Sequence, residues 1–237
     1  MLNKQKHRLI MGEIIREIYT TTTLAPLLGF KGGTCAYFFY GLARFSVDLD
    51  FDLLDDREDF DYEKVLEKIK KIAEKYGTVK DARIKRHTIF TLLSYGQDDH
   101  NIKIEISIRT GAKNLKKYYE IKEYAGISVL AAKQSYAFAM KLVALIDRKL
   151  MVSRDVYDIY FFAKNKWDID GEAIKKKTGK NTAEYLTDCV KAIEKMPNKK
   201  LLEGLGELVN EKEKNWIRKY LKKETIFQLK NYQKSLS

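Results

Sequence analysis

Two short motifs near the start of the chain carry residue types that can act on phosphate esters. The first is a Lys-Gly-Gly-Thr turn at residues 31–34, which comes just before a stretch with helical character. The second is an Asp-Leu-Asp triplet in a predicted strand, with carboxylates at Asp48 and Asp50. Side chains two residues apart on a strand point to the same face. The pattern predicts a Mg²⁺–triphosphate site and transfer of a nucleotide or phosphoryl group.

The turn has the chemistry needed to hold phosphate. Gly32 and Gly33 let the backbone approach a phosphate closely, and Thr34 adds a hydroxyl at the start of a helix. The spacing matches neither the phosphate-binding loop of P-loop NTPases nor the glycine loop of protein kinases. We therefore predict that Lys31, Gly32, Gly33 and Thr34 bind the nucleotide.

Glu105 is the best candidate for a third carboxylate. It lies in a stretch, residues 101–109, where isoleucines alternate with polar residues, as in a strand with one apolar face. Two metal ions about 3.5–4 Å apart need carboxylates that can bridge them. An adjacent strand would place Glu105 beside the two aspartates on the same face of the sheet. We predict that Asp48, Asp50 and Glu105 bind Mg²⁺ or Mn²⁺, with an NTP as substrate. The alternative is a surface glutamate paired with a lysine or arginine of its own strand.

A second group of charged residues lies downstream, on two predicted helices. Lys141 and Arg148 are seven residues apart, so they share a helix face from which they can reach a polyphosphate. Asp155 and Asp158 share a face of the next helix, and Arg154 can pair with either of them. In the alternative interpretation, the two cations form ordinary ion pairs with the two aspartates and simply join the helices. Both interpretations can hold together.

The motifs together resemble a known family. The segments FKGGTCAYFFYGLARFSVDLDF (30–51), KLVALIDR (141–148) and SRDVYDIY (153–160) resemble those of the AbiEii/AbiGii toxins. These are nucleotidyltransferases of the DNA polymerase β-like superfamily and the toxins of type IV toxin–antitoxin systems. The resemblance covers about residues 5–165.

The resemblance implies roles for individual residues. Lys141 would contact the triphosphate, and either Asp158 or Asp155 would be the essential downstream carboxylate, with Asp158 slightly favoured. Ser46 would touch phosphate, and Arg44 would brace the turn. The catalytic set is then Asp48, Asp50, Glu105, Lys141 and Asp158, and the nucleotide-binding set is Lys31, Gly32, Gly33, Thr34, Ser46, Lys141, Arg148, Arg154 and Asp155.

The composition limits the class of protein. The chain has 237 residues, of which 45% are hydrophobic and 33% charged, as expected of an ordinary folded protein without a membrane span. We expect it to be cytoplasmic. Its two cysteines, Cys35 and Cys189, argue against a disulfide or zinc framework. The formal net charge of +12 favours polyanionic partners, either nucleic acid or an acidic antitoxin-like protein.

The expected fold is α+β. We predict a polymerase β-like core with a small mixed sheet and flanking helices at residues 1–127, followed by a helical region at 128–237 that completes the active-site cleft. Hydrophobic patterning predicts strands at about 80–95 and 101–109, joined as a β-hairpin around residues 96–99. It predicts helices at about 4–19, 34–42, 61–76, 129–150, 154–163, 171–177, 182–195, 201–209 and 211–230.

These inferences lead to one main functional hypothesis. The chain would be a metal-dependent nucleotidyltransferase that transfers NMP from an NTP to an acceptor hydroxyl, by resemblance the 3′ end of a tRNA. It would act as the toxin of a toxin–antitoxin or phage-defence pair whose antitoxin is encoded nearby. Two alternatives remain open: a small-molecule or protein acceptor, or a non-catalytic nucleotide-binding module on the same fold.

Overall fold

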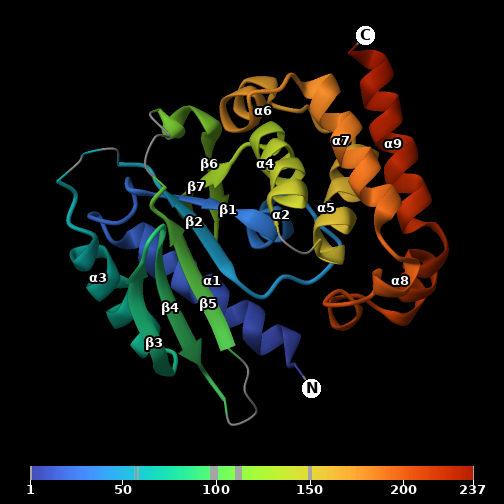
Figure 1. Ribbon diagram of the computed structural model, residues 1–237. Helices are drawn as coiled ribbons and strands as arrows, with labels where there is room; N and C mark the ends of the chain where they lie inside the picture. Colours follow the sequence, from blue (N-terminus) through green and yellow to red (C-terminus); the bar gives the residue numbers. More distant parts are fainter. Residues whose placement is uncertain are drawn as a thin grey trace. The chain divides into compact units, whose positions relative to one another are not determined.

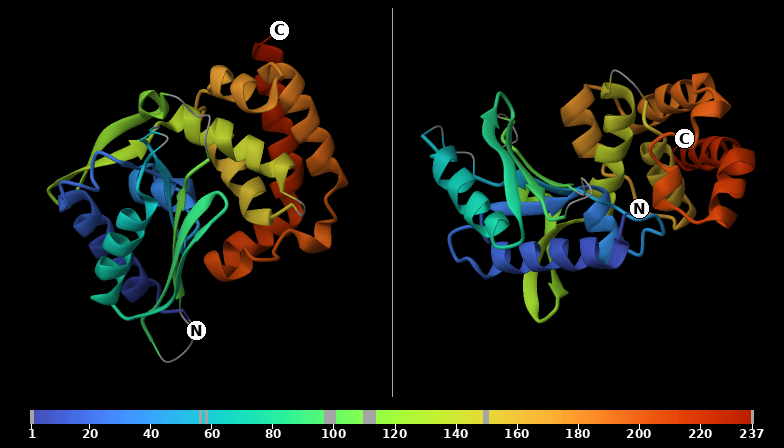
Figure 2. Two further views of the ribbon diagram at one scale, coloured as in Figure 1. Left: turned by 60° about the vertical axis from the view of Figure 1, so that its left-hand side comes forward. Right: turned by 90° about the horizontal axis from the view of Figure 1, so that it is seen from below.

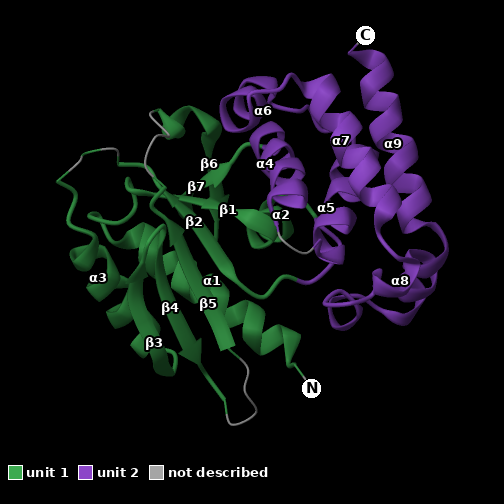
Figure 3. Cartoon of the chain, in the orientation of Figure 1, with its two compact units in different colours: residues 1–41, 46–133 green, residues 42–45, 134–237 purple. Residues whose placement is uncertain are grey.

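The chain divides into two compact units (Figure 3). The computed structural model describes residues 2–55, 57, 59–96, 101–109, 114–148 and 151–236. Unit 1 comprises residues 1–41 and 46–133, and unit 2 comprises residues 42–45 and 134–237. The main division therefore falls after Lys133, whereas the sequence places it at 127.

Unit 1 is built on a seven-stranded mixed sheet in the order β3-β4-β5-β2-β1-β7-β6 (Figure 1). Strands β2 and β5 run parallel, as do β1 and β7, and the other neighbours are antiparallel. The predicted mixed sheet is confirmed. The strands are β1 (Leu28–Lys31), β2 (Leu49–Leu53), β3 (Thr78–Lys85), β4 (Thr88–Ser94), β5 (Asn101–Ser107), β6 (Tyr119–Tyr124) and β7 (Ile127–Ala132).

The α-helices described in unit 1 are α1 (Lys4–Thr20), α2 (Gly32–Phe39) and α3 (Tyr62–Glu74). Helices α1 and α3 lie side by side, and α3 packs on β3 and β4 (Figure 2). The side chains of Asn3 and Asp61 accept hydrogen bonds from the first turns of α1 and α3, which fixes where these helices begin.

Alternation along β2 and β5 separates an apolar face of the sheet from a polar one. Phe51, Ile104 and Ile106 are at most 1% exposed, whereas Asp50 and Glu105 are only half-buried. Burying the isoleucine and phenylalanine positions therefore orients the carboxylates toward the other face.

Unit 2 is helical throughout its described part. Helices α7 and α5 both pack on α9, and α4 packs on α5 and α6. Phe162 stacks on Trp167 in its core with ring centroids 4.1 Å apart. The helices are α4 (Gln134–Asp147), α5 (Ser153–Lys164), α6 (Gly171–Thr178), α7 (Thr182–Lys195), α8 (Glu211–Trp216) and α9 (Lys222–Ser235), with a π-helical turn at Ile217–Leu221 joining the last two. Within the described ranges of both units, no helix is long and apolar enough to cross a membrane.

Three secondary-structure predictions were wrong in detail. Residues 129–132 lie in β7 rather than in a helix, because β1 and β6 provide hydrogen-bonding partners on both sides; a short apolar run does not distinguish a buried strand from a helix. Residues 201–209 form turns and a short 3₁₀ segment, Gly206–Leu208. The stretch from 80 to 95 is split into β3 and β4 by a turn at 86–87. Strands β4 and β5 do pair as predicted, but residues 97–99 of their connection lie outside the described residues.

Candidate active site

The sheet brings two of the three predicted metal ligands together. In the parallel register of β2 and β5, Asp50 is the direct partner of Glu105. Paired residues on adjacent strands lie about 5 Å apart and share a face of the sheet. Glu105 forms no ion pair with any described residue, so the alternative of a surface pair with a lysine or arginine of its own strand is not seen. The predicted adjacency of the Asp50 and Glu105 strands is confirmed.

Asp48 lies just before β2, in a segment fixed by the start of α2. The buried Thr34 donates a hydrogen bond from its hydroxyl to the backbone carbonyl of Asp48. Its Oγ1 is also 2.9 Å from the Oγ of the buried Ser46. Thr34 and Ser46, both predicted to touch phosphate, are thus engaged in positioning the backbone of Asp48.

His7, which the sequence analysis did not select, anchors the same segment. Its imidazole is buried, with Nε2 2.9 Å from the carbonyl oxygen of Val47 and Nδ1 2.5 Å from Tyr95 Oη. The available signal was its place on the buried side of α1, beside Ile10 and Met11. His7 therefore ties the residue before Asp48 to α1 and to the end of β4.

Gly32 contacts Asp50 closely. Its φ of +78° lies in the left-handed region, and a methyl carbon added there would lie 2.5 Å from Asp50 Oδ2. No side chain caps the N-terminus of α2. The first amide groups of an uncapped helix have no partner within the helix and favour anions such as phosphate. The Asp50 carboxylate and the start of α2 are thus close neighbours.

Replacing Gly32 by alanine should abolish most of the activity as well as reduce stability. The left-handed backbone costs a non-glycine residue about 1–2 kcal/mol, and the methyl group must displace Asp50. Gly126→Ala is the matched control, since Gly126 has the same φ of +78° but open space around its Cα. Thermal unfolding should show the backbone loss in both variants and a further loss in Gly32→Ala, and a transfer assay should show a loss for Gly32→Ala alone. Equal transfer activities of the Gly32→Ala and Gly126→Ala variants would contradict the prediction that Gly32 lies close to the reacting groups.

Lys31 lies beside a carboxylate that the sequence analysis did not select. Its Nζ is 2.5 Å from Asp52 Oδ1, and Tyr119 donates a 2.7 Å hydrogen bond from its hydroxyl to Asp52 Oδ2. The Lys31 side chain remains 29% exposed. Asp52 could have been found as the third member of the alternation that begins at Asp48.

The carboxylates fit a magnesium ion that shares its coordination with substrate. Among the described residues, no three His, Cys, Asp or Glu side chains lie close enough together to hold a metal ion by themselves, and this includes the predicted set of Asp48, Asp50 and Glu105. Mg²⁺, however, commonly takes only one or two carboxylates and completes its shell with water and substrate phosphates. The neighbouring Asp50 and Glu105, with Asp48 two residues earlier, provide oxygen donors of this kind.

Within unit 2, the second group of predicted residues forms a buried ionic cluster. Arg44 binds Asp158 through two hydrogen bonds, Nε to Oδ1 at 2.6 Å and Nη2 to Oδ2 at 2.7 Å. Lys141 Nζ lies 3.0 Å from Asp158 Oδ2 and 3.0 Å from Asp155 Oδ1. The side chains of Arg44 and Asp158 are 3% and 0% exposed. Arg44 therefore braces helix α5 rather than only a turn.

Arg44, Lys141 and Asp158 keep their charges at neutral pH. Burial alone would raise the pKa of Asp158, but Arg44 and Lys141 outweigh it and hold that pKa below the ordinary value. Burial likewise opposes the charge of Lys141, whereas Asp158 and Asp155 raise its pKa above the ordinary value. The ion-pair interpretation of this helix pair is thus seen directly, and the predicted contact of Lys141 with triphosphate stays a prediction.

The two remaining arginines differ. Arg148 Nε lies 3.0 Å from Asp155 Oδ2, but that oxygen has no hydrogen bond of acceptable geometry in the described part of the chain. Arg154 is half-buried and makes no ion pair with a described residue, so its expected pairing with Asp155 or Asp158 is not seen. Arg148, at 46% side-chain exposure, is the more accessible of the two paired cations near Asp155.

Comparisons with known proteins identify the family of the chain. The model of the AbiEii family, described as a nucleotidyl transferase toxin of type IV toxin–antitoxin systems, matches residues 14–225. Among solved structures, a candidate nucleotidyltransferase from Helicobacter pylori is 22% identical, with a TM-score of 0.63 over 100% of this chain and 97% of that one.

A second structure, MenT4, a nucleotidyltransferase toxin from Mycobacterium tuberculosis, is 16% identical, with a TM-score of 0.52 over 96% of this chain and 85% of that one. At these identities the likenesses show the fold. A comparison with curated protein sequences gives no match. The family match spans most of the chain, and the chain therefore belongs to the AbiEii family of nucleotidyltransferase toxins.

Proposed function

We propose that this enzyme transfers a nucleoside monophosphate from an NTP to the 3′-terminal hydroxyl of an RNA, with tRNA as the expected acceptor. The observation that carries the proposal is the juxtaposition of Asp50 with Glu105 and with the start of α2 at Gly32. Carboxylates and an anion-binding helix terminus are the two features that a metal–triphosphate substrate requires.

The reaction forms one P–O bond and breaks another, and the proton of the acceptor hydroxyl passes to solvent. The acceptor hydroxyl oxygen attacks the α-phosphorus of the NTP, the bond to the β-phosphate oxygen breaks, and pyrophosphate leaves. A bound divalent cation supplies charge neutralisation at the transferring phosphate when it is present. Asp48, Asp50 and Glu105 would hold that cation, while the amide groups at the start of α2 would hold phosphate oxygens.

Several residues act by holding these groups in place. Thr34 and His7 fix the backbone on either side of the Val47–Asp48 peptide, which limits the freedom of the Asp48 carboxylate. Asp52 and Tyr119 orient Lys31 at the end of β1. Precise placement of reacting groups is the main contribution of the protein in this chemistry, because phosphoryl transfer needs little covalent assistance.

The RNA acceptor and the antitoxin are the finer parts of the proposal. The net charge of +12 supports a polyanionic partner. Membership in a family of type IV toxins supports an antitoxin encoded nearby and a role in a toxin–antitoxin or phage-defence pair.

Purified protein incubated with Mg²⁺, each labelled NTP and total tRNA should label the RNA and release pyrophosphate. Each phosphate contact made by a cationic side chain makes binding more sensitive to salt. The KM for RNA should therefore rise steeply between 50 and 200 mM salt, by about tenfold or more. If activity depends only weakly on salt and the label appears on a small molecule or a protein instead of RNA, the assignment of RNA as the acceptor is overturned. NTP binding without transfer to any acceptor would indicate a non-catalytic module.

A further inference from the structure

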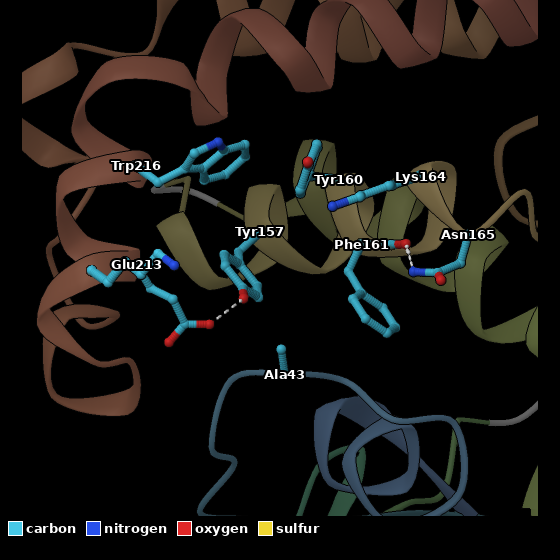
Figure 4. A pocket seen from close by; sticks show the side chains of 9 residues that line it. Ala43, Tyr157, Tyr160, Phe161, Lys164, Asn165, Glu213 and Trp216 are labelled. Atoms are coloured by element: carbon cyan, nitrogen blue, oxygen red, sulfur yellow. Dashed lines mark hydrogen bonds between the residues drawn. The ribbon is translucent and has the colours of Figure 1, made fainter.

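Helix α5 carries a second feature besides the aspartates of the buried cluster. Its Tyr157, Tyr160, Phe161 and Lys164 line a pocket of about 420 Å³ together with Trp216 at the end of α8 (Figure 4). All the lining residues belong to unit 2. The roles assigned above to residues of this helix do not explain why aromatic side chains gather here.

The pocket presents aromatic faces rather than a closed aliphatic lining. The rings of Tyr160 and Trp216 lie 4.7 Å apart, tilted by 39°, and Tyr220 follows Trp216 at 6.3 Å. Tyr220 is 49% exposed and both Tyr160 and Trp216 are partly exposed. Partly exposed aromatic side chains are the groups on which unpaired bases stack.

The surroundings of the pocket are basic. Lys164 and Lys212 line it and are exposed, and neither pairs with a carboxylate of the described residues. The Lys164 ammonium group lies 5.7 Å from the centroid of the Tyr160 ring. Arg218 and Lys219, on the adjacent π-helical turn, are exposed as well. The acidic lining residue Glu213 is already engaged, since it accepts hydrogen bonds from Tyr157 and from the backbone of Asn210. An occupant with an aromatic ring and flanking negative charges suits this chemistry.

We propose that the pocket binds an unpaired nucleobase of a single-stranded RNA, stacked against Tyr160 and Trp216, with Lys164 and Lys212 contacting the adjacent phosphates. The inference rests on the proposed function insofar as it takes the RNA to be the acceptor. It adds a place where the acceptor strand is held, on the helix that also carries Asp155 and Asp158. The additional exposed cations Arg218 and Lys219 on the adjacent turn suit a chain of phosphates better than a single nucleotide.

The two tryptophans of the chain allow the site to be observed directly. Trp167 is 5% exposed and stacked on Phe162, whereas Trp216 lines the pocket. Titrating the full-length protein with an adenylate RNA octamer should quench the fluorescence of Trp216 to saturation. An abasic strand of the same length should not quench the fluorescence of Trp216. In the Trp216→Phe variant, which retains only the buried Trp167, the octamer should cause no quenching. Equal quenching by ATP alone would assign the pocket to the nucleotide substrate and overturn the proposal.

Variants connect binding with activity. Tyr160→Ala should weaken binding of the octamer and raise the KM for RNA by about tenfold or more, with the KM for NTP unchanged. Tyr160→Phe should keep both values, because the ring remains. Phe227→Ala, which removes a 57% exposed aromatic outside the pocket, is the matched control.

Thermal unfolding of each variant separates loss of fold from loss of the site. Normal RNA binding by a folded Tyr160→Ala, together with label transfer, would overturn the pocket assignment and leave the proposed function standing. Quenching by RNA without label transfer to any RNA would do the reverse: it would support the pocket and remove the proposed function.

Discussion

Replacing Asp48 by asparagine should lower the rate of nucleotidyl transfer by about a thousandfold or more. The change removes one negative charge from the proposed metal ligands, and metal ions contribute several kcal/mol of charge stabilisation in such reactions. The fold should persist, because Asp48 is held through its backbone carbonyl, which asparagine retains. The measurement is single-turnover label transfer at saturating NTP, with thermal unfolding recorded in parallel.

Glu123→Gln is the matched control for that variant. It removes a carboxylate of the same unit from an exposed position on the edge strand β6, far along the sheet order from β2 and β5. Transfer by the control should equal that of the unchanged protein. Comparable activity of Asp48→Asn and Glu123→Gln would exclude Asp48 from the chemistry.

Replacing Asp158 by alanine should cost about 3–5 kcal/mol of unfolding free energy, the largest stability effect expected for a single change. The substitution leaves Arg44 without its only carboxylate hydrogen-bond partner among the described residues, and buried unpaired charges are strongly unfavourable. Urea unfolding followed by helical circular dichroism would measure the loss. Asp188→Ala breaks an exposed ion pair with Lys180 in the same unit and should cost less than about 1 kcal/mol.

The same aspartate makes the helical unit sensitive to acid. The pKa of Asp158 is lower in the folded protein than in the unfolded chain, where it is about 3.9. Its contribution to stability is therefore complete above about pH 4 and is lost as the pH falls through the lower, folded-state pKa. The unchanged protein should lose stability over this acidic range, and the Asp158→Ala variant should lose less. Parallel pH profiles of the two proteins would contradict the ionic role of Asp158.

Local chemistry made much of this molecule predictable from sequence. The helix ends marked by Asn3, Asp61 and Asn181 agree with their capping side chains, and the alternation of isoleucines around Glu105 correctly predicts a half-buried strand. The pairing of that strand with the one carrying Asp50 was also expected, because both show one polar face.

What the sequence could not supply depends on contacts between distant residues. The hydroxyl of Thr34 is a group that can bind phosphate, yet it donates a hydrogen bond to the carbonyl oxygen of Asp48, fourteen residues along the chain. Arg44 is a loop residue in the sequence, yet it neutralises Asp158, over a hundred residues downstream. Strand β7 has no periodicity of its own to distinguish it from a helix, and its identity comes from the strands beside it.

The assignment of Leu42–Phe45 to the helical unit has an evolutionary consequence. The four residues lie in the middle of the polypeptide that builds the sheet, yet Phe45 donates a backbone hydrogen bond to Leu208 and Arg44 neutralises Asp158. Recombination at one junction near residue 133 would combine residues Leu42–Phe45 encoded by one parental gene with helices encoded by another. Exchange of the helical part among homologues therefore requires two coordinated crossovers, or an inherited match between the arginine and its distant aspartate.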